Sequence, residues 1–254
     1  MLLPLGLLAI HLTGGQIAQP AAFARPLVGL LEAKWPGNRT VTIVCHGHSV
    51  PAGFFVTPTV QTFDAYPHLL HEALAKKYPH AVVNVIVTAI GGEASDTGAA
   101  RFERDVMSLK PDVVTIDYGL NDRRLGLDAA RAAWESMIEQ ATKGGAKVIL
   151  LTPSWDQSAH PEDPKDPLSL HAEQIRGLAK KYGTGLADSF DAFLKATKSG
   201  TDLPSLMSQV NHPNRAGHEL ILKELLPWFG IETSHHKPRM HPPQPFARFP
   251  VSTR

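Results

Sequence analysis

The sequence has almost no cysteine, almost no net charge and no nucleotide-binding motif, and each lack argues against a class of protein. It has one cysteine in 254 residues, Cys45, so no disulfide can form within the chain. A formal net charge of +1 gives no overall field to attract nucleic acid or an anionic membrane. The sequence has no G-x-G-x-x-G and no Walker A motif, which argues against a nucleotide-binding protein. Its length and its hydrophobic content of 43% instead fit one globular domain with a full core.

The apolar segment at the start of the sequence, residues 1–12, is too short to span a bilayer. It is followed by Ala22-Phe23-Ala24, a cleavage site of the A-x-A kind, although no Lys or Arg precedes the apolar segment. We predict that residues 1–24 are a signal peptide, that the protein is secreted or periplasmic, and that the mature form has no stable membrane span. The alternative is a disordered or loosely docked N-terminus.

The rest of the sequence alternates between apolar runs and segments of helical periodicity. The runs at 41–45, 81–88, 113–118, 146–152 and 185–187 predict strands, and the segments 63–78, 98–109, 128–142, 168–182 and 214–228 predict helices. Strands without alternating polarity, separated by helices, indicate a parallel sheet covered on both faces. We therefore predict an α/β fold, a three-layer α/β/α sandwich, over residues 25–230. Residues 231–254 are rich in Pro and His and are predicted to be disordered.

Small and polar residues follow three of the predicted strands. Ser49 comes after the first strand, Gly91-Gly92 after the second and Asn121 after the third. Ligands of such sheets bind at the carboxyl ends of the strands, so these residues are expected to lie close together. A serine there could act as nucleophile, while glycine N–H groups and an asparagine amide could bind an oxyanion. In isolation, such a serine is more commonly a turn or cap residue and a glycine pair a plain loop, while Asn121 fits an Asn-Asp turn equally well.

His212 precedes the last predicted helix, which Pro213 and Asn214 begin. A histidine held at such a turn can serve as general base, because its ordinary pKa lies near neutral pH.

These positions together resemble the SGNH (GDSL-type) hydrolase family. The resemblance extends from about residue 41 to 228 and rests on four blocks: Gly47-His48-Ser49, Gly92, Gly119-Leu120-Asn121-Asp122 and His212. It implies a parallel, flavodoxin-like sheet of the SGNH hydrolase fold. It also implies a serine esterase that cleaves carboxylic esters through an acyl-Ser49 intermediate, with His212 as base. The Ser49 N–H, the Gly92 N–H and the Asn121 amide would form the oxyanion hole, and no cofactor is implied.

Two residues depart from the family pattern. His48 stands where the family usually has Asp, and its role is left open. Gln209 stands three residues before His212, where the triad Asp is expected. Its amide could accept a hydrogen bond from His212 and fix the tautomer, but it has no charge to stabilise an imidazolium. A Ser-His dyad, a weak enzyme, or a carboxylate supplied from elsewhere by Asp188 or Asp202 remain open.

The family also suggests the substrate, a small molecule or a carbohydrate ester carrying a short acyl group. The alternative function is a non-catalytic glycan- or acyl-binding module on the same fold. A metal site built on His46 and His48 is disfavoured, because no HExxH motif or cysteine cluster supplies a third ligand. Neither the acyl group, the alcohol nor the oligomeric state follows from the sequence.

Overall fold

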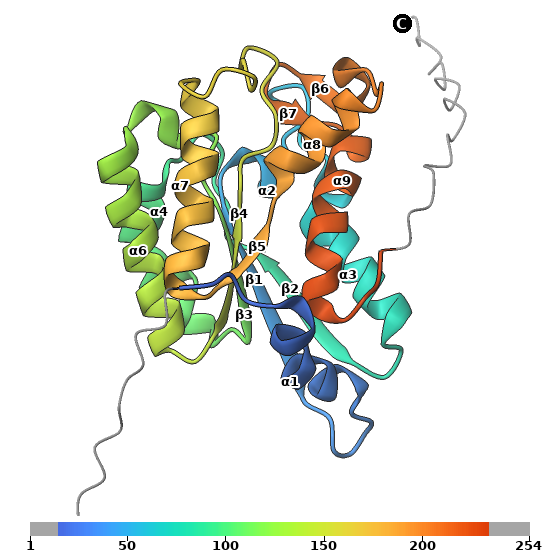
Figure 1. Ribbon diagram of the computed structural model, residues 1–254. Coiled ribbons are helices and arrows are strands. Elements are labelled where there is room, and N and C mark those ends of the chain that lie inside the picture. Colours follow the sequence, from blue (N-terminus) through green and yellow to red (C-terminus); the bar gives the residue numbers. More distant parts are fainter. Residues whose placement is uncertain (1–14, 234–254) are drawn as a thin grey trace, which may run out of the picture.

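A computed structural model of the protein describes residues 15–233. Its centre is a parallel sheet in the spatial order β2-β1-β3-β4-β5 (Figure 1). The strands are β1 (Thr40–Gly47), β2 (Val82–Val87), β3 (Val113–Asp117), β4 (Lys147–Leu151) and β5 (Gly185–Ala187). All five lie where the apolar runs predicted strands, and the order is the flavodoxin-like one that the resemblance implied.

The sheet is buried on both faces because successive strand side chains point to opposite sides. In β1, Ile43 and Cys45 join one core cluster and Val44 joins the other. In β4, Ile149 and Leu150 divide in the same way. This double burial explains why the inner strands read as continuous apolar runs.

Helices cover each face, so the molecule is a three-layer α/β/α sandwich, as predicted (Figure 1). One layer contains α1 (Pro20–Glu32), α3 (Tyr66–Lys77), α8 (Ser189–Lys198) and α9 (Arg215–Leu225). The other contains α4 (Ser95–Ala100), α5 (Phe102–Asp105), α6 (Leu127–Lys143) and α7 (Pro167–Tyr182). Among residues 15–233 no helix is long and apolar enough to cross a membrane.

Short elements complete the fold at the strand ends. They are the helix α2 (Ser49–Ala52), the antiparallel strands β6 (Met207–Gln209) and β7 (His212–Pro213), and the 3₁₀ turns η1 (Thr62–Asp64), η2 (Met107–Leu109), η3 (Asp122–Arg124), η4 (Leu203–Leu206) and η5 (Leu226–Phe229). Two of them matter for the site, because α2 begins with Ser49 and β7 carries His212.

The N-terminal helix α1 begins before the predicted domain boundary between residues 24 and 25. Its residues Phe23 and Ala24 are buried, and the Phe23 ring meets the Trp228 ring edge-on with centroids 5.1 Å apart. The boundary therefore falls inside a helix that packs on the core. Most of the predicted signal peptide and tail, residues 1–14 and 234–254, lies outside the described residues.

Candidate active site

Ser49 lies at the point where the strand order reverses. Its strand, β1, is flanked by β2 on one side and β3 on the other, and such switch points bind ligands in open α/β sheets. Gly47 makes the turn possible, since a Cβ there would lie 2.4 Å from the Asp117 carbonyl oxygen. Ser49 opens α2 with 6% of its surface exposed.

His212 meets Ser49 from the other end of the chain. Its Nε2 lies 2.9 Å from the Ser49 Oγ. The histidine is held by β7 and by the start of α9, where the Asn214 side chain caps the helix by accepting from the Gly217 N–H. Ser49 is thus held at the start of α2, and His212 is held on β7 just before α9.

The tautomer of His212 follows from its second hydrogen bond. Its Nδ1 lies 2.9 Å from the backbone carbonyl oxygen of Phe55, which can only accept. The proton is therefore on Nδ1, and Nε2 presents a lone pair to the Ser49 hydroxyl. Burial lowers the pKa of His212, the Phe55 carbonyl raises it, and the nearby His48 lowers it further.

Gln209, predicted as the possible partner of His212, makes other hydrogen bonds. Its Oε1 accepts from the Thr57 N–H at 3.0 Å, and its Nε2 donates to the Asn211 side chain at 3.1 Å. The Phe55 carbonyl occupies the position predicted for its amide. Because Thr57 is two residues from Phe55, Gln209 instead fastens the loop that supplies this carbonyl.

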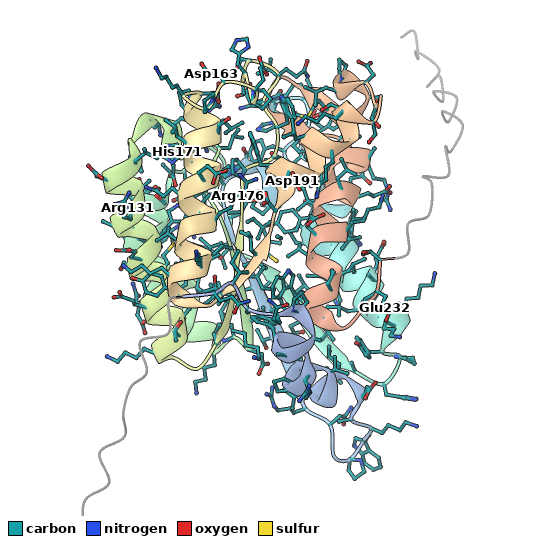
Figure 2. All side chains as sticks on the ribbon, in the orientation of Figure 1. Arg131, Asp163, His171, Arg176, Asp191 and Glu232 are labelled. Atoms are coloured by element: carbon teal, nitrogen blue, oxygen red, sulfur yellow. The ribbon has the colours of Figure 1, made fainter. Side chains whose placement is uncertain are left out.

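The two relocated acids considered from the sequence do not contact His212. Asp188 accepts from Thr152 and from the Arg176 guanidinium, and it caps α8. Arg176 projects from α7 toward α8, where Asp191 lies (Figure 2). Asp202 is exposed and precedes the turn η4. The Asp188 carboxylate thus has a local structural role, whereas the Asp202 side chain makes no cap bond to η4.

The oxyanion residues occupy two neighbouring loops. Gly92 has φ +80°, a conformation that glycine adopts without strain, and its carbonyl accepts from Arg124. Asn121 donates one amide hydrogen to the Glu93 carbonyl at 2.7 Å, which leaves its second hydrogen available. Within the described chain, the N–H groups of Ser49 and Gly92 donate to no protein acceptor.

A buried polar network lies beneath the loop that carries Gly92, and it was not predicted from the sequence. Arg101 binds the Glu93 carboxylate and donates to the Thr88 carbonyl at 2.6 Å. The Tyr118 hydroxyl lies 3.3 Å from Glu93 Oε2 and 3.1 Å from His46 Nε2. These bonds fix both ends of the segment that carries Gly92. No sequence motif signals such a network, because its members come from four separate segments.

His46 and His48 are engaged in separate hydrogen bonds. His46 pairs with Thr88 and with the Gly98 carbonyl, and burial, together with the charge of Arg101, lowers its pKa to about 4. His48 caps α2 by accepting from the Val50 N–H. Among residues 15–233 no three His, Cys, Asp or Glu side chains are arranged to hold a metal ion.

Trp155 and Asp156 follow β4 at the same edge of the sheet and are 7% and 3% exposed. Trp155 stacks on Phe190, and Asp156 forms an ion pair with Arg123. Both side chains therefore hold the loop after β4 in place.

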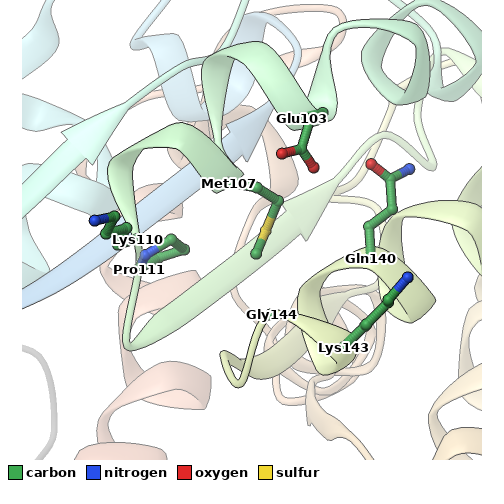
Figure 3. A pocket seen from close by; sticks show the side chains of 7 residues that line it. All are labelled: Glu103, Met107, Lys110, Pro111, Gln140, Lys143 and Gly144. Atoms are coloured by element: carbon green, nitrogen blue, oxygen red, sulfur yellow. The ribbon is translucent and has the colours of Figure 1, made fainter.

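A surface pocket at the opposite end of the sheet is a different feature (Figure 3). Its lining comes from segments at the amino ends of β3 and β4: Glu103, Met107, Lys110, Pro111, Gln140, Lys143 and Gly144. It lies away from the carboxyl edge where Ser49 and His212 meet, so we do not assign chemistry to it.

Comparisons with known proteins point to one group. The profile of the GDSL-like lipase/acylhydrolase family matches residues 45–220. An acetylxylan esterase of Geobacillus stearothermophilus is 24% identical over 167 residues, which is 61% of this chain and 76% of that protein. Esterase TesA of Pseudomonas aeruginosa is 27% identical over 191 residues, 73% of this chain and 86% of that protein.

Solved structures show the same fold. The crystal structure of Axe2, an acetylxylan esterase from G. stearothermophilus, superposes with a TM-score of 0.67 at 22% identity and covers 76% of this chain and 95% of that one. LAE5, described as an alpha/beta hydrolase enzyme from the metagenome of Lake Arreo, gives a TM-score of 0.66 at 22% identity, covering 81% and 100%.

Proposed function

This chain belongs to the GDSL-like lipase/acylhydrolase family and is an ester hydrolase, and from that premise we propose that it cleaves carboxylic esters through an acyl-enzyme formed on Ser49. The observation that carries the proposal is the 2.9 Å contact between the Ser49 Oγ and the His212 Nε2. A binding module has no need of a hydroxyl aligned with an imidazole lone pair, so this geometry favours catalysis over the binding alternative.

In the first step, the Ser49 Oγ attacks the ester carbonyl carbon while its proton moves to His212 Nε2. The carbonyl electron pair moves onto oxygen. When the tetrahedral intermediate collapses, the bond to the alcohol oxygen breaks and His212 returns the proton to that oxygen. Water then repeats the sequence on the acyl-enzyme, which releases the acid and restores Ser49.

Three donors serve the developing oxyanion: the N–H groups of Ser49 and Gly92, and the free amide hydrogen of Asn121. One such donor is worth about 3–4 kcal/mol in transition-state stabilisation. The bonds from Asn121 to the Glu93 carbonyl and from Arg124 to the Gly92 carbonyl support the alignment, because they hold the donor loops together before substrate binds.

The Phe55 carbonyl takes the place of a triad acid in one respect only. It keeps the proton on Nδ1 and orients the ring, which is the tautomer role of the acid in a serine protease. As a neutral dipole it stabilises the imidazolium less than a carboxylate would. We therefore expect a Ser-His dyad in which the tautomer and the ring orientation of His212 are those of a general base.

We propose a short acyl group on a carbohydrate as the substrate. The related protein named acetylxylan esterase supports this choice. Local geometry supports a small acyl group, because the Phe54 ring lies 5.9 Å from the His212 ring and would be 2.7 Å from a Cβ at Gly91. This aromatic side chain fills space between the base and the oxyanion loop.

Hydrolysis of p-nitrophenyl acetate tests the mechanism. We expect Ser49→Ala and His212→Ala each to abolish turnover, and a fluorophosphonate probe to label the wild type and not Ser49→Ala. Ser205→Ala is the matched control, because that hydroxyl only donates to the Asp202 carbonyl at 2.6 Å. Equal rates for wild type and Ser49→Ala would refute the esterase mechanism. Release of acetate from acetylated xylo-oligosaccharides tests the substrate.

A further inference from the structure

A second imidazole touches the nucleophile. The His48 Nδ1 lies 3.3 Å from the Ser49 Oγ, in addition to the His212 nitrogen at 2.9 Å. The Val50 N–H donates to this same Nδ1 at 3.2 Å, so Nδ1 carries no proton. His48 therefore carries its proton on Nε2, and that nitrogen lies 3.4 Å from the Asp117 Oδ1.

Asp117 is a carboxylate almost fully removed from water. It ends β3 with 3% of its surface exposed, and His48 is 1% exposed. In the described chain its only ion-pair partner within 4 Å is His48. Two other titratable groups face it, Cys45 on β1 and Tyr66 on α3, and the Asp117 charge raises the pKa of both. Burial raises the pKa of Cys45 to about 12 and raises the pKa of Tyr66, so both side chains stay neutral, and neither a thiol nor a phenol can supply a positive charge.

Other nearby carboxylates are already engaged. The Asp122 oxygens accept from the Ser95 N–H at 2.8 Å and from the Trp134 Nε1 at 2.7 Å. Glu93 binds Arg101 under the oxyanion loop. His212 faces only the neutral Phe55 carbonyl, with His48 and His218 as its titratable neighbours. Among the residues that the structure describes, no charged group therefore contacts Nδ1 of His212, where a triad acid would lie. The Asp117 carboxylate lies instead beside His48.

We propose that the buried His48–Asp117 pair supplies the negative charge that supports proton transfer from Ser49. Asp117 acts through His48, whose Nε2 faces the carboxylate at 3.4 Å without a formed hydrogen bond and whose Nδ1 lies 3.3 Å from the nucleophile. As His212 takes the Ser49 proton, its positive charge is offset by this carboxylate across a region from which water is excluded. His48 cannot itself protonate the leaving alcohol, because it is buried beneath Ser49. His212 keeps that role, and Asp117 is a positioning and charge residue.

This inference rests on the proposed function, and two variants test it. Asp117→Asn removes the charge and keeps the shape. His48→Asn keeps a side chain that can cap α2 but removes the Nε2 proton from the carboxylate. We expect each variant to lower kcat for p-nitrophenyl acetate on the order of 10-fold with KM little changed, since Asp117→Asn loses the buried charge and His48→Asn loses the imidazole between that charge and Ser49. The double variant should be no slower than either single variant, because the two residues act as a unit.

The pH profile separates this role from a structural one. A nearby carboxylate favours the imidazolium form, so its loss lowers the pKa of His212. The acid limb of kcat/KM, which requires neutral His212, should move to lower pH in Asp117→Asn. His48→Asn keeps the carboxylate and removes a neighbour that lowers the pKa of His212, so its limb should not move to lower pH. Asp188→Asn is the control: it also removes a strand-end carboxylate, bonded to Arg176, and should leave the limb unmoved.

The outcomes are distinct. Single variants with wild-type kcat, an unmoved acid limb in Asp117→Asn, or losses that multiply in the double variant would each overturn the inference. If Asp117→Asn does not fold, as judged by its thermal midpoint, the rate of His48→Asn decides alone. If Ser49→Ala is inactive while His48→Asn matches wild type, only this inference fails. If Ser49→Ala is active, the proposed function fails first.

Discussion

The proposed base, His212, is held by one backbone oxygen. Its burial has a consequence for pH, because removal from water is the largest influence on its pKa and lowers it. We predict that the acid limb of kcat/KM falls below pH 6.5, the ordinary value for histidine. Initial rates on p-nitrophenyl acetate between pH 4.5 and 8 measure it. A limb above the ordinary value would mean that another group controls the rate.

Gln209 affects His212 indirectly, through the loop that carries Phe55. Gln209→Ala deletes the acceptor of the Thr57 N–H and loosens the loop that carries Phe55. We predict a modest loss of kcat, smaller than the loss in His212→Ala. Gln140→Ala on α6, where the side chain only donates to Ser136, is the control. A loss as large as that of His212→Ala would make Gln209 a full member of the catalytic set.

Glu93 and Arg101 brace the oxyanion loop from below. Glu93→Gln keeps the size of the side chain but weakens its charge-assisted bonds to Arg101. We predict a several-fold lower kcat with KM little affected, because the donors at Gly92 and Asn121 lose alignment at the transition state. Glu135→Gln, which breaks an exposed ion pair with Lys181, should have no effect. A raised KM with unchanged kcat would place Glu93 in ground-state binding instead.

The sequence analysis located residues whose side chains have distinctive chemistry. Ser49 and His212 were predicted to meet, and the structure places them in hydrogen-bonding contact. Phe55 could not be found in this way, because every residue has a carbonyl and only the folded loop decides which one faces the base. Asp117 could not be found either, because in the sequence it is only the polar residue near the end of a predicted strand, and its contact with His48 appears only in the fold.

At the scale of elements, the strongest apolar runs and amphipathic segments were predicted well, and elements that depend on tertiary packing were not. The predicted helix 98–109 is instead α4, α5 and η2 in succession. Gly98 packs so tightly on Tyr118 that a Cβ would lie 2.3 Å from its ring, so this segment is shaped by contact and not by propensity. The helices α1, α2 and α8 were missed, the first because its start, up to residue 24, was assigned to a signal peptide.

The packing of α1 predicts a stability effect. Phe23→Ala should lower the free energy of unfolding by about 3 kcal/mol, because it empties a buried aromatic site against Trp228. Phe63→Ala, at a side chain that is 71% exposed, should change it by less than about 0.5 kcal/mol. Urea unfolding of both variants measures the difference. Equal midpoints would show that α1 adds nothing to the domain.

The same helix bears on export, which remains a prediction. Cleavage between residues 24 and 25 would remove Phe23 and also the bond from the Ala18 N–H to the Thr184 carbonyl at 3.0 Å. A chain starting at residue 25 should therefore melt at a lower temperature than the full chain. Mass spectrometry of protein recovered from outside the cytoplasm would locate the cut. An unchanged melting temperature would contradict the packing role of these residues.

At the scale of the whole molecule, the sequence predicted a parallel sheet with two covering layers but not the pairing of its strands. The order β2-β1-β3-β4-β5 followed from the family resemblance, because apolar runs alone do not say which strand lies beside which. The gathering of strand-end residues at one edge was predictable, since all parallel strands end there. The buried polar groups between sheet and helices were not.

Two of these buried groups predict how the whole fold responds to acid. Burial lowers the pKa of His218 to about 3 and the pKa of His46 to about 4. In the unfolded chain both titrate near 6.5, so their contribution to stability is complete above that pH and is lost as the pH falls toward 4. The free energy of unfolding should drop by several kcal/mol between pH 7 and 4. Urea midpoints across this range measure the drop.

A matched pair of variants isolates the cause. His218→Asn keeps an acceptor for the Tyr66 N–H but removes the titrating ring, so the pH dependence should be shallower. His160→Asn, at an exposed side chain, should leave it unchanged. The same slope in all three proteins would assign acid sensitivity to the carboxylates.

The hydrogen bond between the Phe55 carbonyl and His212 has a practical consequence for mutagenesis. The group that sets the imidazole belongs to the main chain, so no codon change deletes it. An alanine scan would report Phe55 as dispensable, or sensitive only through its ring, and would overlook the atom that matters. Only a chemical edit of the backbone itself, or a deletion that shifts the loop past His212, would reveal it.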